Sequence, residues 1–227
     1  MADHGWRQNL DDALSGLYAL IYIRYVSIAS SYTLLPMDIK TLFTPFPVLP
    51  TSRLVLRALR QNDLDDLYAY ASDPEIDHYT PWTHYKSLAE AQIDLDSFIS
   101  EYDRHGLGAW GIEHRAERRL IGIINISPPH PRNRRTEMGF TIARTHWGQG
   151  YAAEAATAVI RFGLEKMQLL RIEAVCLPEN LASARVLLKI GMQYEGLLRK
   201  YQVWRGKPCD LQMYALTADG RDEQKSE

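Results

Sequence analysis

Hydrophobic and polar positions change period several times along the chain, and each change predicts an element. Short alternating runs predict strands, whereas apolar residues that recur every three or four positions predict helices. By this criterion the predicted strands are residues 53–57, 109–113, 120–126, 137–143, 171–177, 194–204 and 211–216. The predicted helices are residues 64–71, a segment opened by Ser87, residues 151–166 and residues 180–190.

Three details of these elements are specific enough to test. The helix opened by Ser87 is expected to have Ala89, Ile93, Leu95, Phe98 and Ile99 on its apolar side. Gly191 is expected to close the helix over residues 180–190, because glycine is the preferred residue just beyond a helix C-terminus. The last two strands are expected to form a hairpin that turns at residues 206–208, Gly-Lys-Pro.

Prolines at positions 45, 47 and 50 predict a boundary ahead of the first strand. We therefore expect an N-terminal extension over residues 1–50 and one folded domain over residues 51–217. Residues 218–227 read as a charged, loose tail.

Residues 14–36 are mostly apolar, but Arg24 and several serines interrupt them before the roughly 20 apolar residues of a membrane span are reached. Acidic residues outnumber the single arginine in the first twelve positions, which argues against a signal peptide. Two interpretations stay open. The segment is an amphipathic or docking helix, or translation naturally starts at Met37 and the first 36 residues are an upstream artefact.

The overall composition is that of an ordinary globular protein, with 46% hydrophobic and 24% charged residues and a net charge of −2. Such a small net charge gives no general attraction to nucleic acid or to an anionic membrane. The two cysteines are far apart, and the seven histidines lack metal-ligand spacing. We therefore expect no metal and no disulfide framework, a cytoplasmic location, and a monomer or homodimer.

The most informative segment is the turn over residues 147–152, Trp-Gly-Gln-Gly-Tyr-Ala, just ahead of a predicted helix. Glycines let backbone N–H groups converge, and the first-turn amides of a helix lack partners within it. The helix dipole adds positive potential, so the turn suits a pyrophosphate. By itself, Gly-x-Gly fits a simple turn equally well. A dinucleotide-binding turn would require glycine where Ala153 stands, and the Gly-Lys-Ser/Thr of a phosphate-binding Walker loop is absent.

Several ordered motifs around this turn resemble the GNAT acetyltransferases. They are residues 137–142, the turn with Glu154 and Ala155, residues 177–183, residues 189–196 and the closing stretch 204–216. The resemblance covers about residues 49–216 and is closest to the ribosomal-protein-alanine N-acetyltransferases, the RimJ/RimL-like branch. It implies the GNAT fold, an α/β (α+β) arrangement with a mostly antiparallel twisted sheet, one splayed parallel pair, and helices on both faces.

This resemblance also implies acetyl-CoA as the acyl donor. Backbone groups of the splayed strand would hold the pantetheine arm, as an added strand is held; they belong to Phe140, Thr141 and Ile142. Asn180 and Ser183 would contact the same arm, although asparagine is also a preferred N-cap residue. The amides that would bind the pyrophosphate are those of Trp147, Gly148, Gln149, Gly150, Tyr151 and Ala152, with Trp147 replacing the family's usual arginine or glutamine.

The implied reaction is direct attack of a neutral amine on the thioester in a ternary complex, with strand N–H groups polarising the carbonyl. Glu137 is the first candidate base, and a surface carboxylate is its equally weighted alternative; Glu173 ranks second. Many relatives protonate the departing thiolate with a tyrosine, but the matching residue is Leu187. Ser183 is therefore the candidate for stabilising the thiolate. Some relatives have a glutamate at the position of Gln202.

An α-amine is the better acceptor for an enzyme without a strong base, because its pKa is about 8, whereas that of lysine is about 10.4. The acceptor groove is expected between the loop over residues 79–85, with Trp82 and His84, and the hairpin near Tyr201. Core anchoring is the equally weighted alternative for the aromatic residues of this loop. A protein N-terminus, such as that of a ribosomal protein, is the leading acceptor. A small amine (an antibiotic, polyamine or amino acid) and a non-catalytic acyl-CoA sensor are the alternatives.

Overall fold

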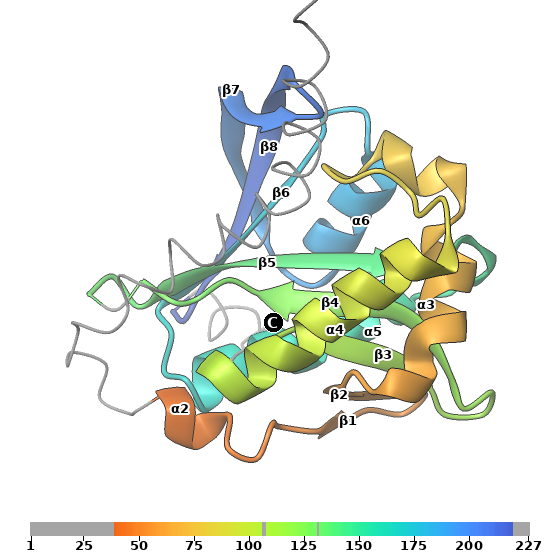
Figure 1. The fold of residues 1–227 in the computed structure, drawn as a ribbon. Coiled ribbons are helices and arrows are strands. Elements are labelled where there is room, and N and C mark those ends of the chain that lie inside the picture. The colour runs from red at the N-terminus through yellow and green to blue at the C-terminus, as the bar shows by residue number, and fades with distance from the viewer. Residues whose placement is uncertain (1–38, 106–107, 131, 220–227) are drawn as a thin grey trace, which may run out of the picture.

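The computed structural model describes residues 39–105, 108–130 and 132–219. In these residues the strands form an eight-stranded sheet in the order β1-β2-β3-β4-β5-β6-β8-β7 (Figure 1). Neighbouring strands are antiparallel except for the parallel pair β5–β6, which confirms the expected mixed sheet. The strands are β1 (Leu49–Pro50), β2 (Leu54–Ala58), β3 (Trp110–His114), β4 (Arg119–Ile126), β5 (Arg135–Ile142), β6 (Arg171–Cys176), β7 (Gln193–Trp204) and β8 (Lys207–Thr217).

Helices cover both faces of this sheet, as expected. Helix α4 crosses one face and α5 lies against the other (Figure 1). The helices are α2 (Ile39–Leu42), α3 (Leu64–Ala71), α4 (Leu88–His105), α5 (Tyr151–Glu165) and α6 (Leu181–Lys189). Short 3₁₀ turns η1 (Gln61–Asp63), η2 (Pro74–His78) and η3 (Arg144–His146) connect them. None of the described helices is long and apolar enough to cross a membrane.

The parallel pair β5–β6 separates after a short stretch of pairing. Its register joins residues 135–137 of β5 to residues 171–173 of β6, although β5 continues to Ile142 and β6 to Cys176. Helix α5 follows β5 and α6 follows β6, so both helix N-termini lie at the open end of this splay. The expected splayed pair is thereby confirmed, and it brings the glycine turn and Asn180 to one end of the sheet.

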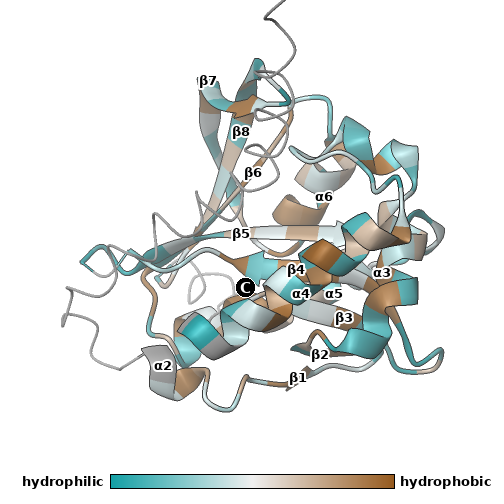
Figure 2. Cartoon of the chain, viewed as in Figure 1, coloured by the Kyte–Doolittle hydropathy of each residue, from teal (hydrophilic) through white to brown (hydrophobic). Residues whose placement is uncertain are grey.

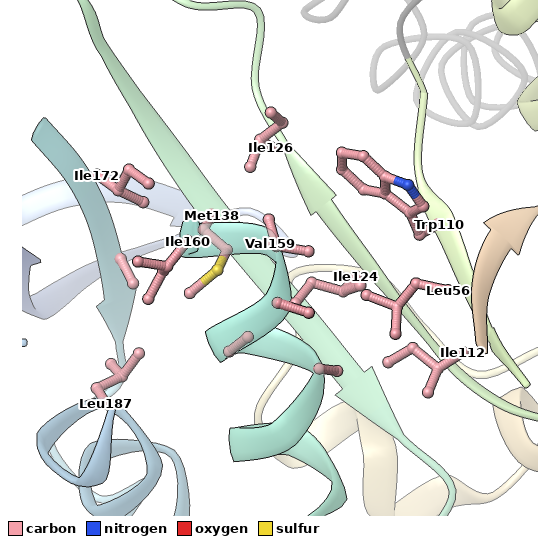
Figure 3. Packing of buried hydrophobic residues seen from close by; sticks show 14 of the residues in the cluster. Leu56, Trp110, Ile112, Ile124, Ile126, Met138, Val159, Ile160, Ile172 and Leu187 are labelled. Carbon is pink, nitrogen blue, oxygen red and sulfur yellow. The ribbon is translucent and has the colours of Figure 1, made fainter. Parts of the chain in front are cut away.

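The larger hydrophobic core lies between the sheet and α5, where Val159 and Ile160 meet Leu56, Ile124 and Met138 (Figure 3). Residues ahead of Thr51 belong to it. Phe43 is 3% exposed, and the rings of Phe43 and Phe46 lie 5.7 and 5.3 Å from that of Trp110. The folded core therefore starts before the boundary expected at residue 50. The interpretations of residues 1–36 and the tail from residue 220 fall outside the described residues.

The apolar side of α4 differs from the expectation at two residues. Ala91 and Leu95 are buried, with Phe98 and Ile99 half-buried, whereas Ile93 is 66% exposed and Ala89 is also exposed. One residue rotates a helix by about 100°, so a helix that buries Ala91 and Leu95 turns Ile93 toward solvent. The mixture of hydrophilic and hydrophobic residues along α4 is visible in Figure 2.

The terminal hairpin turns one position earlier than expected. Arg205 and Gly206, at φ 48° and 76°, form the turn, while Lys207 and Pro208 already pair with Trp204 and Val203. Two consecutive positive φ angles make the two-residue hairpin turn that suits twisted strands. Proline is tolerated in β8 here because β6 pairs only with the later part of that strand, from Gln212 onward. The C′ position of Gly191, at φ 88°, is as expected.

Candidate functional site

The glycine turn connects η3 to α5 in a conformation that depends on its glycines. Gly148 and Gly150 have φ angles of 72° and 83°, in the left-handed region that side chains disfavour. The first helical bond runs from the Glu154 amide to the Gly150 carbonyl at 3.0 Å. The amides of Tyr151, Ala152 and Ala153 therefore precede the first intrahelical bond. This arrangement can bind an anion at the positive end of the helix dipole.

Glu154, in the first turn of α5, ties this turn to the chain ahead of β2. Its carboxylate accepts hydrogen bonds from the Thr51 hydroxyl at 2.6 Å, the Ser52 hydroxyl at 3.0 Å, and the Arg53 amide and Nε at 2.8 and 2.7 Å. Burial opposes ionisation, but these hydrogen bonds outweigh it and lower the pKa of Glu154 to about 2. Glu154 is thus ionised at neutral pH and joins the first turn of α5 to the chain ahead of β2.

Arg53 extends the same connection to the turn itself. Its Nη1 donates to the Gln149 carbonyl at 3.0 Å, and its guanidinium lies 4.3 Å from the centroid of the Tyr151 ring. An open depression of about 440 Å³ lies beside these residues, with Arg161 and Lys189 in its lining. Periodicity could not reveal Arg53 as part of the site, because it is far from the turn in sequence. The sequence indicated its partner Glu154 only as one residue of the motif that resembles the family.

The side chain of Tyr151 packs against His114. The ring is buried, its hydroxyl lies 3.0 Å from His114 Nε2, and the two rings meet edge to face. On the neighbouring side, His146 Nε2 lies 3.3 Å from the Glu117 carboxylate. The contacts with His114 fix the Tyr151 ring, while the Tyr151 amide lies at the helix N-terminus.

Trp147 is 42% exposed at the head of the turn. Its indole N–H donates to the Ile142 carbonyl at 2.6 Å. The indole therefore connects the end of β5 to the turn, a role that sequence reasoning did not anticipate. Gln149 behaves in a similar way, because its side-chain amide donates to the Thr145 carbonyl at 3.0 Å.

The hydrogen-bond alternation of β5 decides which of its backbone groups face the splay. The Ser127 amide donates to the Glu137 carbonyl at 2.8 Å, and the Ala143 amide donates to the Ile121 carbonyl at 2.7 Å. In an antiparallel ladder these bonding pairs recur at every second residue, so the odd-numbered residues of β5 face β4. Of the three residues expected to present backbone groups, Phe140 and Ile142 therefore do so, whereas the Thr141 backbone is directed to β4.

The N-terminus of α6 carries the two residues expected there. Asn180 Oδ1 accepts a hydrogen bond from the Ser183 amide at 3.0 Å, which makes Asn180 the N-cap. Ser183 is half-buried in the first turn. Leu187, one turn further along, is 1% exposed and belongs to the main core (Figure 3). The position that is a tyrosine in many relatives is therefore occupied by a core residue.

The two candidate bases lie side by side in the β5–β6 register but differ in their partners. Glu173 is 7% exposed and pairs with Arg135 at 2.6 Å and with Arg171 at 2.7 Å. The carboxyl of Glu137 makes no hydrogen bond among the residues that the structure describes. Burial and then the negative charge of Glu173 raise the pKa of Glu137, while Arg135 opposes that shift. Glu137 is consequently the carboxyl better suited to accept a proton.

The loop expected to line an acceptor groove is fixed by hydrogen bonds to the residues that flank it. The His84 amide and Nδ1 both bond to the Asp77 carboxylate, the latter at 2.8 Å, and Lys86 Nζ lies 2.7 Å from His84 Nε2. Burial of the Asp77 carboxylate acts against the hydrogen bonds from His84, which prevail and lower its pKa. The ring of Trp82 stacks with that of Tyr85. His84 is thus engaged in stabilising the loop.

The hairpin approaches this loop through Arg205, whose Nη1 lies 4.0 Å from Asp77 Oδ2. Tyr201, the hairpin residue expected to line the groove, is 46% exposed on β7. The loop and the tip of the hairpin are therefore close together, and Arg205 makes the ion pair that connects them. Sequence reasoning missed Arg205 because it placed the turn of the hairpin one residue later.

The described residues contain neither a candidate metal site nor a reactive buried thiol at Cys176. No group of three histidine, cysteine, aspartate or glutamate side chains there could hold a metal ion. Burial raises the pKa of the Cys176 thiol to about 11, so this cysteine is protonated at neutral pH.

Several known proteins resemble this chain over about three quarters of its length. Residues 53–193 match the acetyltransferase (GNAT) domain family. The chain is 36% identical over 171 residues to the uncharacterized N-acetyltransferase YoaA of Bacillus subtilis, covering 75% of this chain and 97% of that protein. It is 30% identical over 182 residues to the [ribosomal protein uS5]-alanine N-acetyltransferase of Escherichia coli, covering 74% and 90%. Mycobacterium smegmatis RimJ in complex with CoA-disulfide has a TM-score of 0.65 at 26% identity, covering 73% and 82%.

Proposed function

The chain belongs to the GNAT acetyltransferase family and is an acetyl-CoA-dependent N-acetyltransferase, and we propose that its acceptor is the N-terminal α-amine of a protein. The glycine turn and the splayed strand pair support acetyl-CoA as the donor, and the observation that carries the choice of acceptor is the similarity to an enzyme that acetylates a protein N-terminus. A ribosomal protein is the leading acceptor, in keeping with the similarity to the uS5-alanine enzyme.

Donor binding in this proposal uses backbone groups. The amides of residues 147–152 receive the pyrophosphate, with Gly148 and Gly150 allowing close approach. The backbone groups of Phe140 and the Ile142 amide receive the pantetheine arm in the splay, since the Ile142 carbonyl already accepts a hydrogen bond from the Trp147 indole. The Thr141 backbone pairs with β4 and takes no part in this contact. Asn180 holds the first turn of α6, where Ser183 is positioned to meet the arm.

The chemistry requires a neutral amine, a polarised carbonyl and a stabilised thiolate. Glu137 accepts the proton of the amine, directly or through a water molecule, and its raised pKa favours this role. Strand N–H groups polarise the thioester carbonyl. The Ser183 hydroxyl stabilises the departing thiolate, since Leu187 offers no proton. An α-amine suits an enzyme without a strong base, because a larger fraction of an α-amine than of a lysine side-chain amine is neutral at pH 7.

The donor site is tested by isothermal titration of acetyl-CoA into the wild-type protein and into Gly150→Glu. The new side chain would impose strain at φ 83° and place a carboxylate where the phosphates bind. A matched control is Gly206→Glu in the hairpin turn, which has a similar φ of 76° and no atom within 4 Å of the added Cβ. We expect Gly150→Glu to abolish binding and Gly206→Glu to retain it. Equal binding by both variants would place the phosphates elsewhere.

The acceptor is tested by following CoA release with alanine- and serine-initiated peptides, their N-acetylated counterparts, and a polyamine. We expect turnover with the free peptides and none with the N-acetylated ones. Turnover of the polyamine alone would replace the protein acceptor by a small amine. Acetyl-CoA binding without turnover of any amine would identify a sensor.

A further inference from the structure

The open depression of about 440 Å³ beside the glycine turn has a positively charged lining. Three of its side chains are cationic, those of Arg53, Arg161 and Lys189, and one, that of Glu154, is anionic. The whole chain has a net charge of −2, so this excess of positive charge is local. A concave surface lined by one sign of charge concentrates ions of the opposite sign. The depression is therefore suited to an anion.

The single carboxylate of this lining already has its partners. Glu154 accepts four hydrogen bonds from residues 51–53, and its side chain is 15% exposed. Arg53 donates from Nε to Glu154 and from Nη1 to the Gln149 carbonyl. Its Nη2 makes no hydrogen bond to the described residues and lies 3.6 Å from the position that a Cβ of residue 150 would take. Arg53 Nη2 is thus available where the turn meets the depression.

The other two cations reach the depression from different helices. Arg161 lies on α5, and Lys189 is the last residue of α6. Both residues are exposed, so a molecule can approach them. Within the part of the chain that the structure describes, neither side chain forms an ion pair or a hydrogen bond. Two helices therefore present unpaired positive charges to one concave surface.

We propose that Arg161 and Lys189, together with Arg53 Nη2, bind the 3′-phosphate on the ribose of acetyl-CoA. Gln149 and Gly150 belong both to the glycine turn and to the lining, so a pyrophosphate on the turn borders the depression. In CoA only the ribose separates the 3′-phosphate from this pyrophosphate. A phosphate monoester carries about −1.5 to −2 charges at pH 7, and its oxygens accept charge-assisted hydrogen bonds from arginine and lysine. The depression offers such donors beside the turn.

This inference rests on the donor site of the proposed function and assigns the depression to selection among donors. A donor that lacks the 3′-phosphate would keep its contacts with the turn and lose those with the depression. We therefore expect a preference for thioesters of CoA over those of dephospho-CoA or of phosphopantetheine alone. A free phosphate ion has the same oxygen chemistry, so the experiment has to distinguish the phosphate of the donor from a free ion.

The test is isothermal titration of CoA and of dephospho-CoA, which lacks only the 3′-phosphate, into the wild-type protein. We expect CoA to bind about tenfold more tightly, because each exposed cation contributes little and three act together. Arg161→Gln and Lys189→Gln should each weaken CoA binding about threefold and leave dephospho-CoA binding unchanged. Lys166→Gln is the matched control, because Lys166 is exposed at the end of α5 but does not line the depression. It should keep the full preference.

The preference for CoA should also shrink as the salt concentration rises, because exposed charges are screened. Equal affinities of the wild type for CoA and dephospho-CoA would overturn the proposal, as would a full preference in both Arg161→Gln and Lys189→Gln. Inorganic phosphate is titrated into the CoA-saturated protein, and binding that Lys189→Gln abolishes would assign the depression to a free ion instead. If neither CoA nor dephospho-CoA binds the folded wild type, the donor site itself fails. Equal binding of both removes only this subsite.

Discussion

At the scale of single residues, Glu154 connects the glycine turn to the chain ahead of β2 through four hydrogen bonds. Its pKa is about 2 in the folded protein and 4.5 without these partners. A carboxylate with a lowered pKa contributes stability above its unfolded value and loses that contribution as the pH falls toward its folded value. The contribution of Glu154 is therefore complete above about pH 5 and lost between about pH 4.5 and pH 2.

We expect Glu154→Gln to lower the free energy of unfolding by about 1–3 kcal/mol at pH 7, an amount limited by the solvent exposure of Arg53. Urea denaturation of both proteins at pH 7 and pH 3 measures this difference, which should shrink at the lower pH. Glu75→Gln is the control, because that glutamate is 52% exposed. A difference that stays constant with pH would show that packing rather than charge accounts for the effect.

Substitution by glutamine should affect catalysis at Glu137 and stability at the adjacent Glu173. Glu137→Gln removes the proposed proton acceptor, so we expect kcat to fall by about 10²- to 10⁴-fold with unchanged acetyl-CoA binding. Since burial raises the pKa of Glu137, the wild-type rate should rise with pH through that raised pKa.

Glu173→Gln leaves Arg135 and Arg171 without their shared carboxylate, so we expect a loss of stability before any loss of chemistry. Steady-state kinetics and thermal denaturation of the two variants separate these roles. Retention of full kcat by Glu137→Gln would remove that residue from the mechanism.

At the scale of elements, the sequence predicted those structures whose signals are local. The glycine turn and α5 follow from two glycines and a helix-forming run, and the N-cap role of Asn180 follows from its residue type. The splay of β5 and β6 came from family resemblance, because periodicity carries no information about which strands pair. The direction of the Thr141 backbone depends on the register with β4, and the bonds between Arg53 and Glu154 span 101 residues. Neither can be deduced from local sequence.

Helix α4 shows why a helical pattern does not fix the buried face. Ile93 and Leu95 are both large and apolar, yet two positions separate their directions by about 200°. We expect Ile93→Lys to change the free energy of unfolding by less than about 0.5 kcal/mol, because Ile93 is 66% exposed. Leu95→Ala should cost about 2–5 kcal/mol, because Leu95 is fully buried. Chemical denaturation of the two variants measures these changes in the free energy of unfolding. Equal losses of stability would mean that α4 rotates to bury both residues.

At the scale of the whole molecule, the two faces of the sheet carry separate hydrophobic clusters. The core with α5 includes Tyr151 of the glycine turn, whereas the cluster with α3 and α4 includes Trp82 and Tyr85 of the loop over residues 79–85. Under the proposed function, the donor would bind beside the first of these clusters and the acceptor beside the second.

Phe43 and Phe46 make the larger core depend on residues ahead of the first long strand. Their rings pack against Trp110, and that of Phe43 also lies 5.6 Å from the ring of Phe162 on α5. A chain that begins at Thr51 would leave Trp110 uncovered, whereas a chain that begins at Met37 would keep Phe43, Phe46 and Pro47 against it. We expect the shorter chain to be less stable by about 3–6 kcal/mol, because each buried phenylalanine contributes several kcal/mol.

Comparing these two truncations isolates residues 37–50, and thermal denaturation with acetyl-CoA titration measures both consequences. Because α5 carries the glycine turn at its N-terminus, loosening the core beneath α5 should weaken acetyl-CoA binding together with stability. Equal melting temperatures for the two chains would show that the Phe43 cluster is dispensable and that the folded unit does begin near residue 51. A lower melting temperature with unchanged acetyl-CoA affinity would show that the turn is held by Arg53 and Glu154 independently of the core below it.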